Sequence, residues 1–357
     1  MDLKRGVGLL LACLLLLALF AGCRRTPAEK QTEPPRQSEP TEPPVTDPTA
    51  EPTEPVTEPV TDPDPVDVPT DADVHPMLFH VTGENGQECW LFGTIHAGDE
   101  RIGQVLTQME SVLDICDALA VEFDIVAYEQ DYDAQMDQMM SFALLDGTTV
   151  DQHMPPELFA RASALLQEAG LMPELMKMFN LAMWSQLMEQ AALITRSDLD
   201  IEIGIDRELI GYCYEHNIEV RDVESAELQY NLLLSFPDEL NLLLIEQTLD
   251  GLDTYGEELN ELYEAWLRGN YDEITALLQA EDEEAAEKYT DEERALIEDY
   301  NYKMLPERNL GMRDKAVEWL EAGDKVFFAV GAAHLCGEEG LVELLRAAGY
   351  TVEQVEY

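Results

Sequence analysis

Prolines are concentrated in one stretch near the start of this chain. Of the 19 prolines in the 357-residue sequence, 14 lie between Pro27 and Pro76. The segment 24–76 contains no Phe, Tyr or Trp, so it offers little apolar surface to offset the conformational entropy lost on folding. This segment therefore cannot form a packed domain. The folded part is expected to be residues 77–357, which have spaced apolar residues and enough length for a sizeable core.

The residues before the proline-rich stretch have the pattern of a secretory leader. Lys4 and Arg5 precede a leucine-rich run, and small residues follow it before Cys23. Residues 1–22 are therefore interpreted as a signal peptide, because the apolar run is short for a membrane span. Leu19 to Cys23 resembles a bacterial lipobox, with Phe20 where leucine is usual. Cys23 is the predicted lipidation site, and an ordinary signal peptide with an incidental cysteine is the alternative.

Residues 23–76 are expected to act as a tether. The Thr-Glu-Pro theme repeats at Thr41, Thr53 and Thr57, and like-charged, proline-dense repeats favour extended polyproline II conformers. At about 3.1 Å per residue, such a stalk holds a domain up to ~150 Å from a bilayer. A lipid on Cys23 and this stalk together predict attachment to a bacterial cell membrane on its extracytoplasmic side.

The charge balance of residues 77–357 excludes some classes of partner. This part carries 15 basic and 60 acidic residues, a net charge of −45. It repels phosphate backbones and anionic lipid, so nucleic acid is not an expected partner. Basic or neutral substrates and metal cations would be attracted, although an acidic surface also serves solubility alone.

The order of apolar patterns predicts an α/β fold. A hairpin over 77–92, a helix over 105–116 and a buried strand over 118–121 come first, and a helix through Trp319, strands over 326–330 and 350–355 and a helix over 338–348 come last. Between them the pattern is mainly helical, with one further strand at 218–220. We therefore expect a mixed sheet built from N- and C-terminal βαβ-like segments, with a large helical insertion.

The helical insertion is rich in methionine. The nine methionines from Met136 to Met188 are interpreted chiefly as helical core packing. An adaptable peptide-binding groove is the alternative, because the flexible thioether side chain adapts to varied partners.

Two loops share a pattern that carries chemistry. One strand runs into Gly93-Thr94-Ile95-His96 and a late strand runs into Gly331-Ala332-Ala333-His334. Glycine is expected to let the backbone turn sharply off the sheet, and the carboxyl ends of strands in open α/β sheets are where ligands bind. Glu122 also follows a strand directly. We therefore predict that His96, His334 and Glu122 converge, although each histidine is alternatively a hydrogen-bonded loop or core residue.

Two imidazoles and one carboxylate form a ligand set for a divalent first-row metal ion such as Mn, Co, Zn or Fe. A metal ion in such a site lowers the pKa of bound water and polarises a carbonyl, which suits hydrolysis of a peptide or an ester. His96, His334 and Glu122 are therefore the predicted metal ligands.

Four segments together resemble the TraB/GumN family, which is related to the TIKI Wnt-inactivating metalloproteases. They are Trp90 to His96, Val121 to Asp124, Glu307 to Asn309, and Phe328 to His334. The segment Gly204 to Asp206, followed by Asp222 to Ser225, resembles the middle of that family. The resemblance implies an α/β fold akin to erythromycin-esterase-like and ChaN-like domains, and metal-dependent proteolysis.

The resemblance also implies roles for single residues. The paired family histidines correspond to His96 and His334, and the family acidic residue corresponds to Glu122, which serves as a ligand or as the general base. Arg308 matches a family arginine and is either a catalytic residue that stabilises an oxyanion or one partner of an ion pair. Asp206 either orients a ligand histidine or caps a helix, and capping is the favoured interpretation.

The predicted function is a membrane-anchored metal-dependent hydrolase that acts on a peptide or protein substrate. Two alternatives stay open at this point. One is a lipoprotein that sequesters peptides without cleaving them. The other is a domain that binds a metal ion or haem through the same histidines without hydrolysis.

Overall fold

The computed structural model describes residues 74–279 and 288–356. The strands and their bounds are β1 (Leu78–Thr82), β2 (Glu88–Thr94), β3 (Ala118–Val121), β4 (Glu219–Asp222), β5 (Val326–Gly331) and β6 (Thr351–Gln354). They form one six-stranded mixed sheet in the order β4-β3-β5-β2-β1-β6. This arrangement confirms the predicted α/β class and mixed sheet.

The sheet has a parallel part and an antiparallel part. β4, β3, β5 and β2 run parallel to one another, whereas β1 pairs antiparallel with both β2 and β6. β5 lies in the middle of the parallel part, and every residue from Val326 to Gly331 is buried. Its continuous apolar sequence is typical of a parallel strand covered on both faces. The carboxyl ends of the four parallel strands therefore lie along the same edge.

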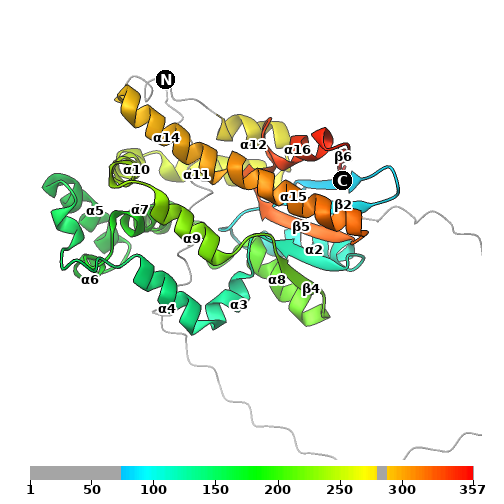
Figure 1. The fold of residues 1–357 in the computed structure, drawn as a ribbon, viewed down its shortest axis with the longest axis horizontal. Coiled ribbons are helices and arrows are strands. Elements are labelled where there is room, and N and C mark those ends of the chain that lie inside the picture. Colours follow the sequence, from blue (N-terminus) through cyan, green and yellow to red (C-terminus); the bar gives the residue numbers. More distant parts are fainter. Residues whose placement is uncertain (1–73, 280–287, 357) are drawn as a thin grey trace, which may run out of the picture.

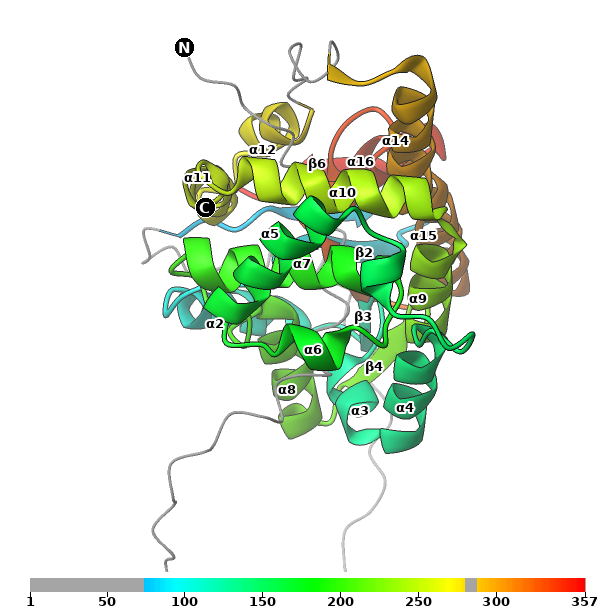
Figure 2. The same ribbon diagram turned by 90° about the vertical axis from the view of Figure 1, so that its left-hand side faces the viewer.

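Helices cover both faces of the sheet, as Figures 1 and 2 show. Phe328 of β5 contacts Trp319 of α15 (Pro306–Ala322). Its neighbour Phe327 contacts Phe92 of β2. Phe92 in turn contacts Trp266 of α11 (Tyr255–Leu267). Successive strand residues point to opposite faces, so α15 and α11 lie on opposite sides. α8 (Ile205–His216) packs on β3, β4 and α2 (Ile102–Leu113), and α16 (Leu341–Ala347) packs on β6 and α15.

A mainly helical insertion separates β3 from β5, as predicted. Its remaining helices are α3 (Ile125–Gln130), α4 (Tyr132–Ser141), η3 (Val150–Gln152), α5 (Pro156–Glu168), α6 (Pro173–Met176), α7 (Leu181–Arg196), α9 (Ala226–Ser235), α10 (Asp238–Gly251), α12 (Tyr271–Leu278) and α14 (Asp291–Met304). The insertion has its own apolar core around Trp184 and Met188 of α7. Thirteen of the sixteen residues of α7 are buried, so α7 is the central helix of the insertion.

The start of the folded part lies before Met77. Val74 belongs to the apolar core, and its carbonyl accepts a hydrogen bond from the buried Gln108 side chain at 2.6 Å. Residues 1–73, which hold the leader, Cys23 and most of the stalk, lie outside the described residues, as do residues 280–287 before α14. Within the described ranges, no helix is long and apolar enough to cross a membrane.

Candidate functional site

Four polar side chains follow the four parallel strands at their carboxyl ends. His96 follows β2, Glu122 follows β3, Glu224 follows β4, and His334 follows β5 within the short helix η4 (Ala332–Leu335). Parallel strands bring these positions to one edge of the sheet, which is where ligands bind in open α/β sheets. The sequence pattern predicted three of these four positions.

Gly331 marks the point where the predicted residues meet. A Cβ atom placed on Gly331 would lie 3.2 Å from Glu122 Oε1, 3.7 Å from His334 Cδ2 and 3.8 Å from His96 Nε2. The two loops therefore converge, with Glu122 between the histidines. The chain does leave the sheet sharply at this glycine, because β5 ends at Gly331 and η4 begins at Ala332. Gly331 has an ordinary φ of −47°, so the site needs glycine for space and not for a left-handed turn.

His96 is held by Asp206, the second residue of α8. The His96 Nδ1 atom lies 2.8 Å from Asp206 Oδ2. The favoured capping interpretation of Asp206 is wrong, because Gly204 is the N-cap of α8 and no side chain caps this helix. A Cβ atom on Gly204 would lie 2.7 Å from the His96 carbonyl oxygen. Only glycine allows α8 to begin so close to the His96 backbone, and this closeness directs Asp206 at the imidazole.

His334 is held by Asn309 of α15. The His334 Nδ1 atom lies 2.6 Å from Asn309 Oδ1. Asn309 Nδ2 donates to the Glu339 carbonyl at 2.8 Å, which fixes the amide with Oδ1 facing the histidine. His334 therefore carries its hydrogen on Nδ1, and its Nε2 atom presents a lone pair. This Nε2 atom lies 3.7 Å from Glu122 Oε1.

Arg308 forms a buried double ion pair beside the histidines. Its Nη2 atom donates to Glu122 Oε2 at 2.6 Å and to Glu224 Oε2 at 2.7 Å, and its Nε atom donates to Glu224 Oε1 at 3.0 Å. Nη1 donates to the Met304 carbonyl at 3.1 Å. Of the two interpretations of Arg308, the ion pair is the one that the structure shows.

The two carboxylates have further hydrogen bonds. Gln229 Nε2, on α9, donates to Glu122 Oε2 at 3.0 Å and to Glu224 Oε2 at 2.8 Å. The Gly331 backbone N–H donates to Glu122 Oε1 at 3.0 Å. Glu122 and Glu224 are thereby held in place, and their two negative charges face a single guanidinium.

The charges around the site shift the pKa values of its groups in different directions. Burial alone would raise the pKa of Glu122, but the charge of Arg308, followed by those of the two histidines, holds that pKa well below its usual range. Burial alone would lower the pKa of His96, but the charge and hydrogen bond of Asp206 outweigh it and raise that pKa to about 9. Burial and the charge of Arg308 lower the pKa of His334 to about 3. Near neutral pH, Glu122 is ionised, His334 is neutral and His96 is protonated. A metal ion bound at His96 Nε2 would displace that proton, because only a neutral imidazole ligates a metal.

The donor atoms of the site are of the types that ligate divalent cations. Histidines that ligate metals commonly have one ring nitrogen fixed by a carboxylate or an amide oxygen, as His96 and His334 have. Two ligands of a tetrahedral zinc ion lie about 3.4 Å apart, close to the 3.7 Å between His334 Nε2 and Glu122 Oε1. The side chains do not, however, already surround a metal ion at ligand distances. In the described ranges, no group of three or more His, Cys, Asp or Glu side chains is placed to hold a metal ion.

Sequence reasoning assigned no role to Glu224, Gln229 or Asn309. A signal existed for Glu224, because it follows the strand expected at 218–220 just as Glu122 follows its strand. Gln229 and Asn309 lie on helices, and no spacing pattern in the sequence links them to the histidines.

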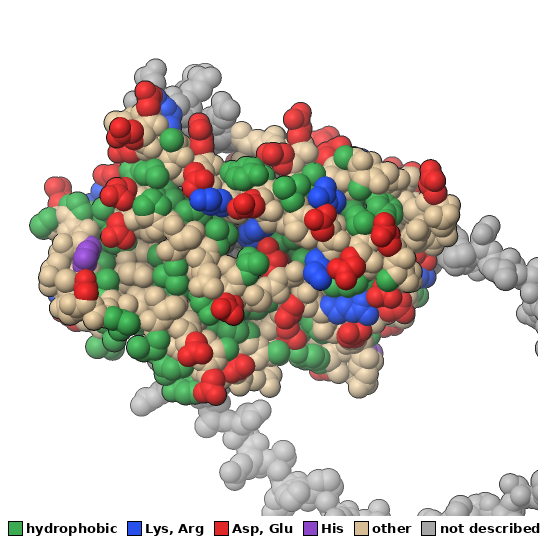
Figure 3. Space-filling view, viewed as in Figure 1, with side chains coloured by type: hydrophobic (Ala, Val, Ile, Leu, Met, Phe, Trp, Pro, Cys, Tyr) green, Lys and Arg blue, Asp and Glu red, His purple; other side chains and the backbone are tan. Residues whose placement is uncertain are grey.

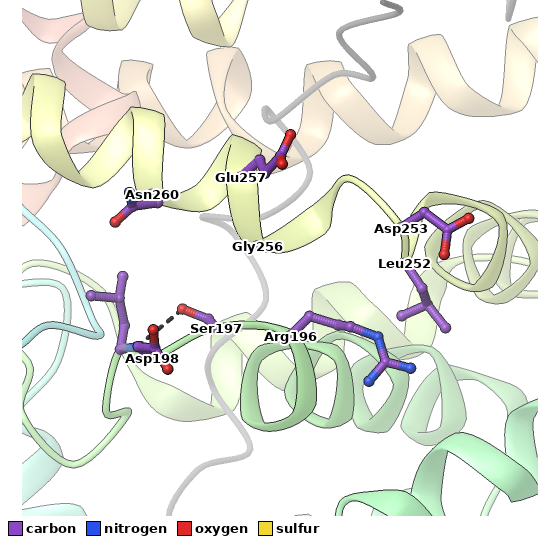
Figure 4. A pocket seen from close by; sticks show the side chains of 9 residues that line it. Arg196, Ser197, Asp198, Leu252, Asp253, Gly256, Glu257 and Asn260 are labelled. Carbon is purple, nitrogen blue, oxygen red and sulfur yellow. Dashed lines mark hydrogen bonds between the residues drawn. The ribbon is translucent and has the colours of Figure 1, made fainter.

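A separate pocket of about 350 Å³ lies between the end of α7 and the start of α11 (Figure 4). Ser197 and Asp198 line one side, and Glu257 and Asn260 line the other. None of the site residues described above lines this pocket. The described cysteines, Cys89, Cys116, Cys213 and Cys336, are free thiols.

The fold and the strand-end residues together define an α/β protein with a histidine and carboxylate site at the edge of a mixed sheet. The model of the TraB/PrgY/gumN family matches residues 77–354. The chain therefore belongs to the TraB/PrgY/gumN family, as the motif resemblance predicted.

Two relatives have sequences similar to most of this chain. One is the "Uncharacterized protein YbaP" of Shigella flexneri, which is 27% identical over 268 residues, or 74% of this chain and 90% of the relative. The other is the "Uncharacterized protein YbaP" of Escherichia coli strain K12, which is 28% identical over 258 residues, or 72% of this chain and 87% of the relative. No solved structure matches this chain.

Proposed function

We propose that this protein is a peptide hydrolase that uses a divalent metal ion held by His96, His334 and Glu122. One observation carries the proposal, namely the convergence of His96, His334 and Glu122 around Gly331. In both histidines a hydrogen-bond partner fixes Nδ1. Such an ion, when bound, lowers the pKa of a water molecule and polarises a substrate carbonyl.

The side chains of the site have distinct parts in this proposal. Asp206 and Asn309 hold the two imidazole rings, and Gly331 leaves space for a ligand between them. Glu122 stays ionised because Arg308 lowers its pKa, which favours a ligand over a general base at neutral pH, since a weakly basic carboxylate is a poor proton acceptor. Glu122 is therefore assigned as a ligand.

Arg308 is assigned to holding Glu122 and not to the reacting carbonyl. Its side chain is buried, and three of its nitrogen atoms already donate to Glu122, Glu224 and the Met304 carbonyl. Turning the guanidinium toward an oxyanion would break the ion pair with at least one buried carboxylate, which is energetically costly.

Substrate class and location follow from the remainder of the chain. The net charge of −45 over residues 77–357 favours neutral or basic peptides. A lipid on Cys23 and the proline-rich stalk would hold the domain on the extracytoplasmic side of a bacterial membrane. The likeness to erythromycin-esterase-like and ChaN-like domains stays a prediction.

Metal content and peptide cleavage, measured on the same preparations, test the proposal. The full chain is purified, its bound metals are quantified by mass spectrometry, and a peptide library is assayed with added Mn, Co and Zn. His96→Ala and His334→Ala are expected to lose both the metal and cleavage. His216→Ala is the control, because His216 is exposed and stacks on Tyr212 away from the site.

Three outcomes would contradict the proposal. Metal content and cleavage unchanged in both histidine variants would exclude this site. Tight peptide binding with the ligand recovered intact would support the sequestering alternative. A haem absorbance band that both variants lose, without peptide cleavage by the wild type, would support the haem-binding alternative.

A further inference from the structure

The helical insertion exposes a group of large apolar side chains. The exposed fraction is 80% for Leu145 and 62% for Met172, whereas side chains of this kind are usually buried. We call the group the methionine patch. Its members are Tyr132, Met140, Leu145, Met172, Leu175 and Met178. Figure 3 shows apolar side chains gathered over α4 and α6 on this part of the surface.

Backbone contacts hold the segments of the patch together. Leu144 N donates to the Met178 carbonyl at 2.8 Å, and Ala143 forms an isolated bridge with Phe179. The loop that carries Leu145 therefore runs beside the segment that carries Met178. That segment follows α6 directly, and α6 and the residue before it carry Leu175 and Met172. These contacts place the segment that ends at Leu145 beside the segment that ends at Met178.

The apolar core of the insertion is complete without the patch. Met176, Phe179, Met183 and Met188 are buried in that core, which confirms core packing as the main role of the methionines. Met140, Met172 and Met178 lie outside it and are exposed. Gathered exposed apolar side chains of this kind usually mark an interaction surface, and methionine adapts to partners of varied shape.

The surroundings of the patch are acidic. Between residues 125 and 180 the sequence has nine acidic residues, and its only basic residues are Arg161 and Lys177. Both basic residues are already paired, Arg161 with Asp250 and Lys177 with Glu174.

Three exposed carboxylates next to patch residues lack such a partner. Asp133 follows Tyr132, Asp137 lies one helical turn before Met140, and Asp146 follows Leu145. None of the three forms a salt bridge with a residue that the structure describes.

We propose that the methionine patch binds a cationic amphipathic peptide, with the apolar side of the peptide on the patch and its lysines or arginines on the neighbouring carboxylates. An acid-fringed surface of methionine and leucine favours such a ligand by both burial and charge. A second copy of the chain would bring the same carboxylates against each other. An anionic lipid surface would be repelled.

Binding at the patch is distinct from chemistry at the histidine site, because the patch contains none of the site residues. Peptide binding at the patch can therefore be disproved without disproving hydrolysis at the histidine site, and the reverse also holds. A variant with His96→Ala is expected to bind the peptide as the wild type does, whether or not the protein cleaves peptides.

The test measures fluorescence anisotropy of a labelled synthetic peptide of leucine and lysine with its leucines on one helical face. The full chain carrying His96→Ala is used, so that cleavage does not interfere. The double change Leu145→Gln with Met178→Gln is expected to weaken binding at least about tenfold, because two apolar contacts are lost. Asp133→Asn with Asp137→Asn is expected to weaken binding less and to reduce its dependence on salt.

Matched controls distinguish the patch from unspecific adhesion. Ile115→Gln changes an exposed apolar residue beyond the end of α2, away from the insertion, and is expected to leave affinity unchanged. A peptide with glutamate in place of lysine is expected not to bind. Equal binding of the two peptides, or equal affinity of the patch variant and wild type, would overturn the proposal. So would a patch-dependent dimer or patch-dependent binding to zwitterionic vesicles in the absence of peptide binding.

Discussion

Arg308 Nη2 lies 2.6 Å from Glu122 Oε2, although the two residues are 186 positions apart in the sequence. Arg308 comes from α15 on one face of the sheet, whereas Glu122 comes from the end of β3. Their ion pair therefore joins the C-terminal part of the fold to the N-terminal part, in the middle of the candidate site. Both side chains are largely buried, with 6% and 15% exposed, so little water screens the interaction.

Replacing Arg308 with methionine is expected to destabilise the protein by about 3–5 kcal/mol, because it leaves the Glu122 and Glu224 carboxylates buried without a counter-ion. Denaturant unfolding measures the change. Arg308→Lys keeps the charge but loses the forked geometry, so its expected loss is smaller.

Arg313→Met is the control for this prediction. Arg313 lies on the same helix but pairs with its exposed neighbour Asp314, so the expected change is below about 1 kcal/mol. Adding Glu224→Gln to Arg308→Met should recover part of the loss. Similar unfolding free energies for Arg308→Met and Arg313→Met would show that the buried ion pair contributes nothing.

Gly331→Ala tests whether the space between the histidines is the ligand site. The added methyl group would lie 3.2 Å from Glu122 Oε1 and 3.8 Å from His96 Nε2. The backbone of Gly331 is compatible with alanine, so stability should change by less than about 1 kcal/mol. Metal content and peptide cleavage are expected to fall at least about tenfold, because the methyl group occupies the space of the ligand.

Gly311→Ala is the matched glycine variant, since no atom lies within 4 Å of its added Cβ on α15. Gly311→Ala should leave both the metal content and peptide cleavage unchanged. Full metal content and activity in Gly331→Ala would place any metal site elsewhere.

Asp206→Ala tests the orientation of His96. Loss of the carboxylate frees the imidazole, so the affinity for zinc or cobalt is expected to fall about tenfold to a hundredfold. Titration calorimetry measures the affinity. Glu208→Ala removes an exposed carboxylate from the same helical turn, so it should change the affinity little. Equal losses in the two variants would indicate a general charge effect.

The sequence predicts the part of the site that depends on strand order and misses the part that depends on helix packing. His96, Glu122 and His334 each follow a strongly apolar strand, and parallel strands must end at the same edge. β4 has a weaker pattern, with Glu219 and Arg221 on either side of Val220 as is typical of an edge strand. This weak strand pattern explains why the sequence does not predict Glu224 as a site residue.

The helical partners could not be predicted for a physical reason. Asp206 and His96 are 110 positions apart, and Gln229 and Glu122 are 107 apart. Local sequence shows that a helix begins near Gly204, but the packing of the whole chain decides which side of that helix meets the histidine. The same limit applies to Asn309, whose helix was predicted although its contact with His334 was not.

Glu189 of α7 predicts a pH dependence of stability that is separate from the candidate site. Its carboxylate accepts a hydrogen bond from the Thr248 hydroxyl, and its Oε2 atom has no hydrogen-bond partner among the described residues. Burial raises the pKa of Glu189 to about 7 in the folded protein. The unfolded value is about 4.3, so the folded state binds the proton more tightly than the unfolded state does.

This difference fixes the sign of the effect. The stabilisation is fully present below about pH 4.3 and is lost as the pH rises through about 7, by up to about 4 kcal/mol in total. Because other groups titrate in the same range, the test compares unfolding free energies of the wild type and Glu189→Gln from pH 5 to pH 8. The variant should lose less stability than the wild type over this range, because glutamine stays neutral. Glu246→Gln on α10 removes an exposed carboxylate and should follow the wild-type curve. If the curves for Glu189→Gln and the wild type are parallel, Glu189 does not take up a proton in this range and must be ionised within the core.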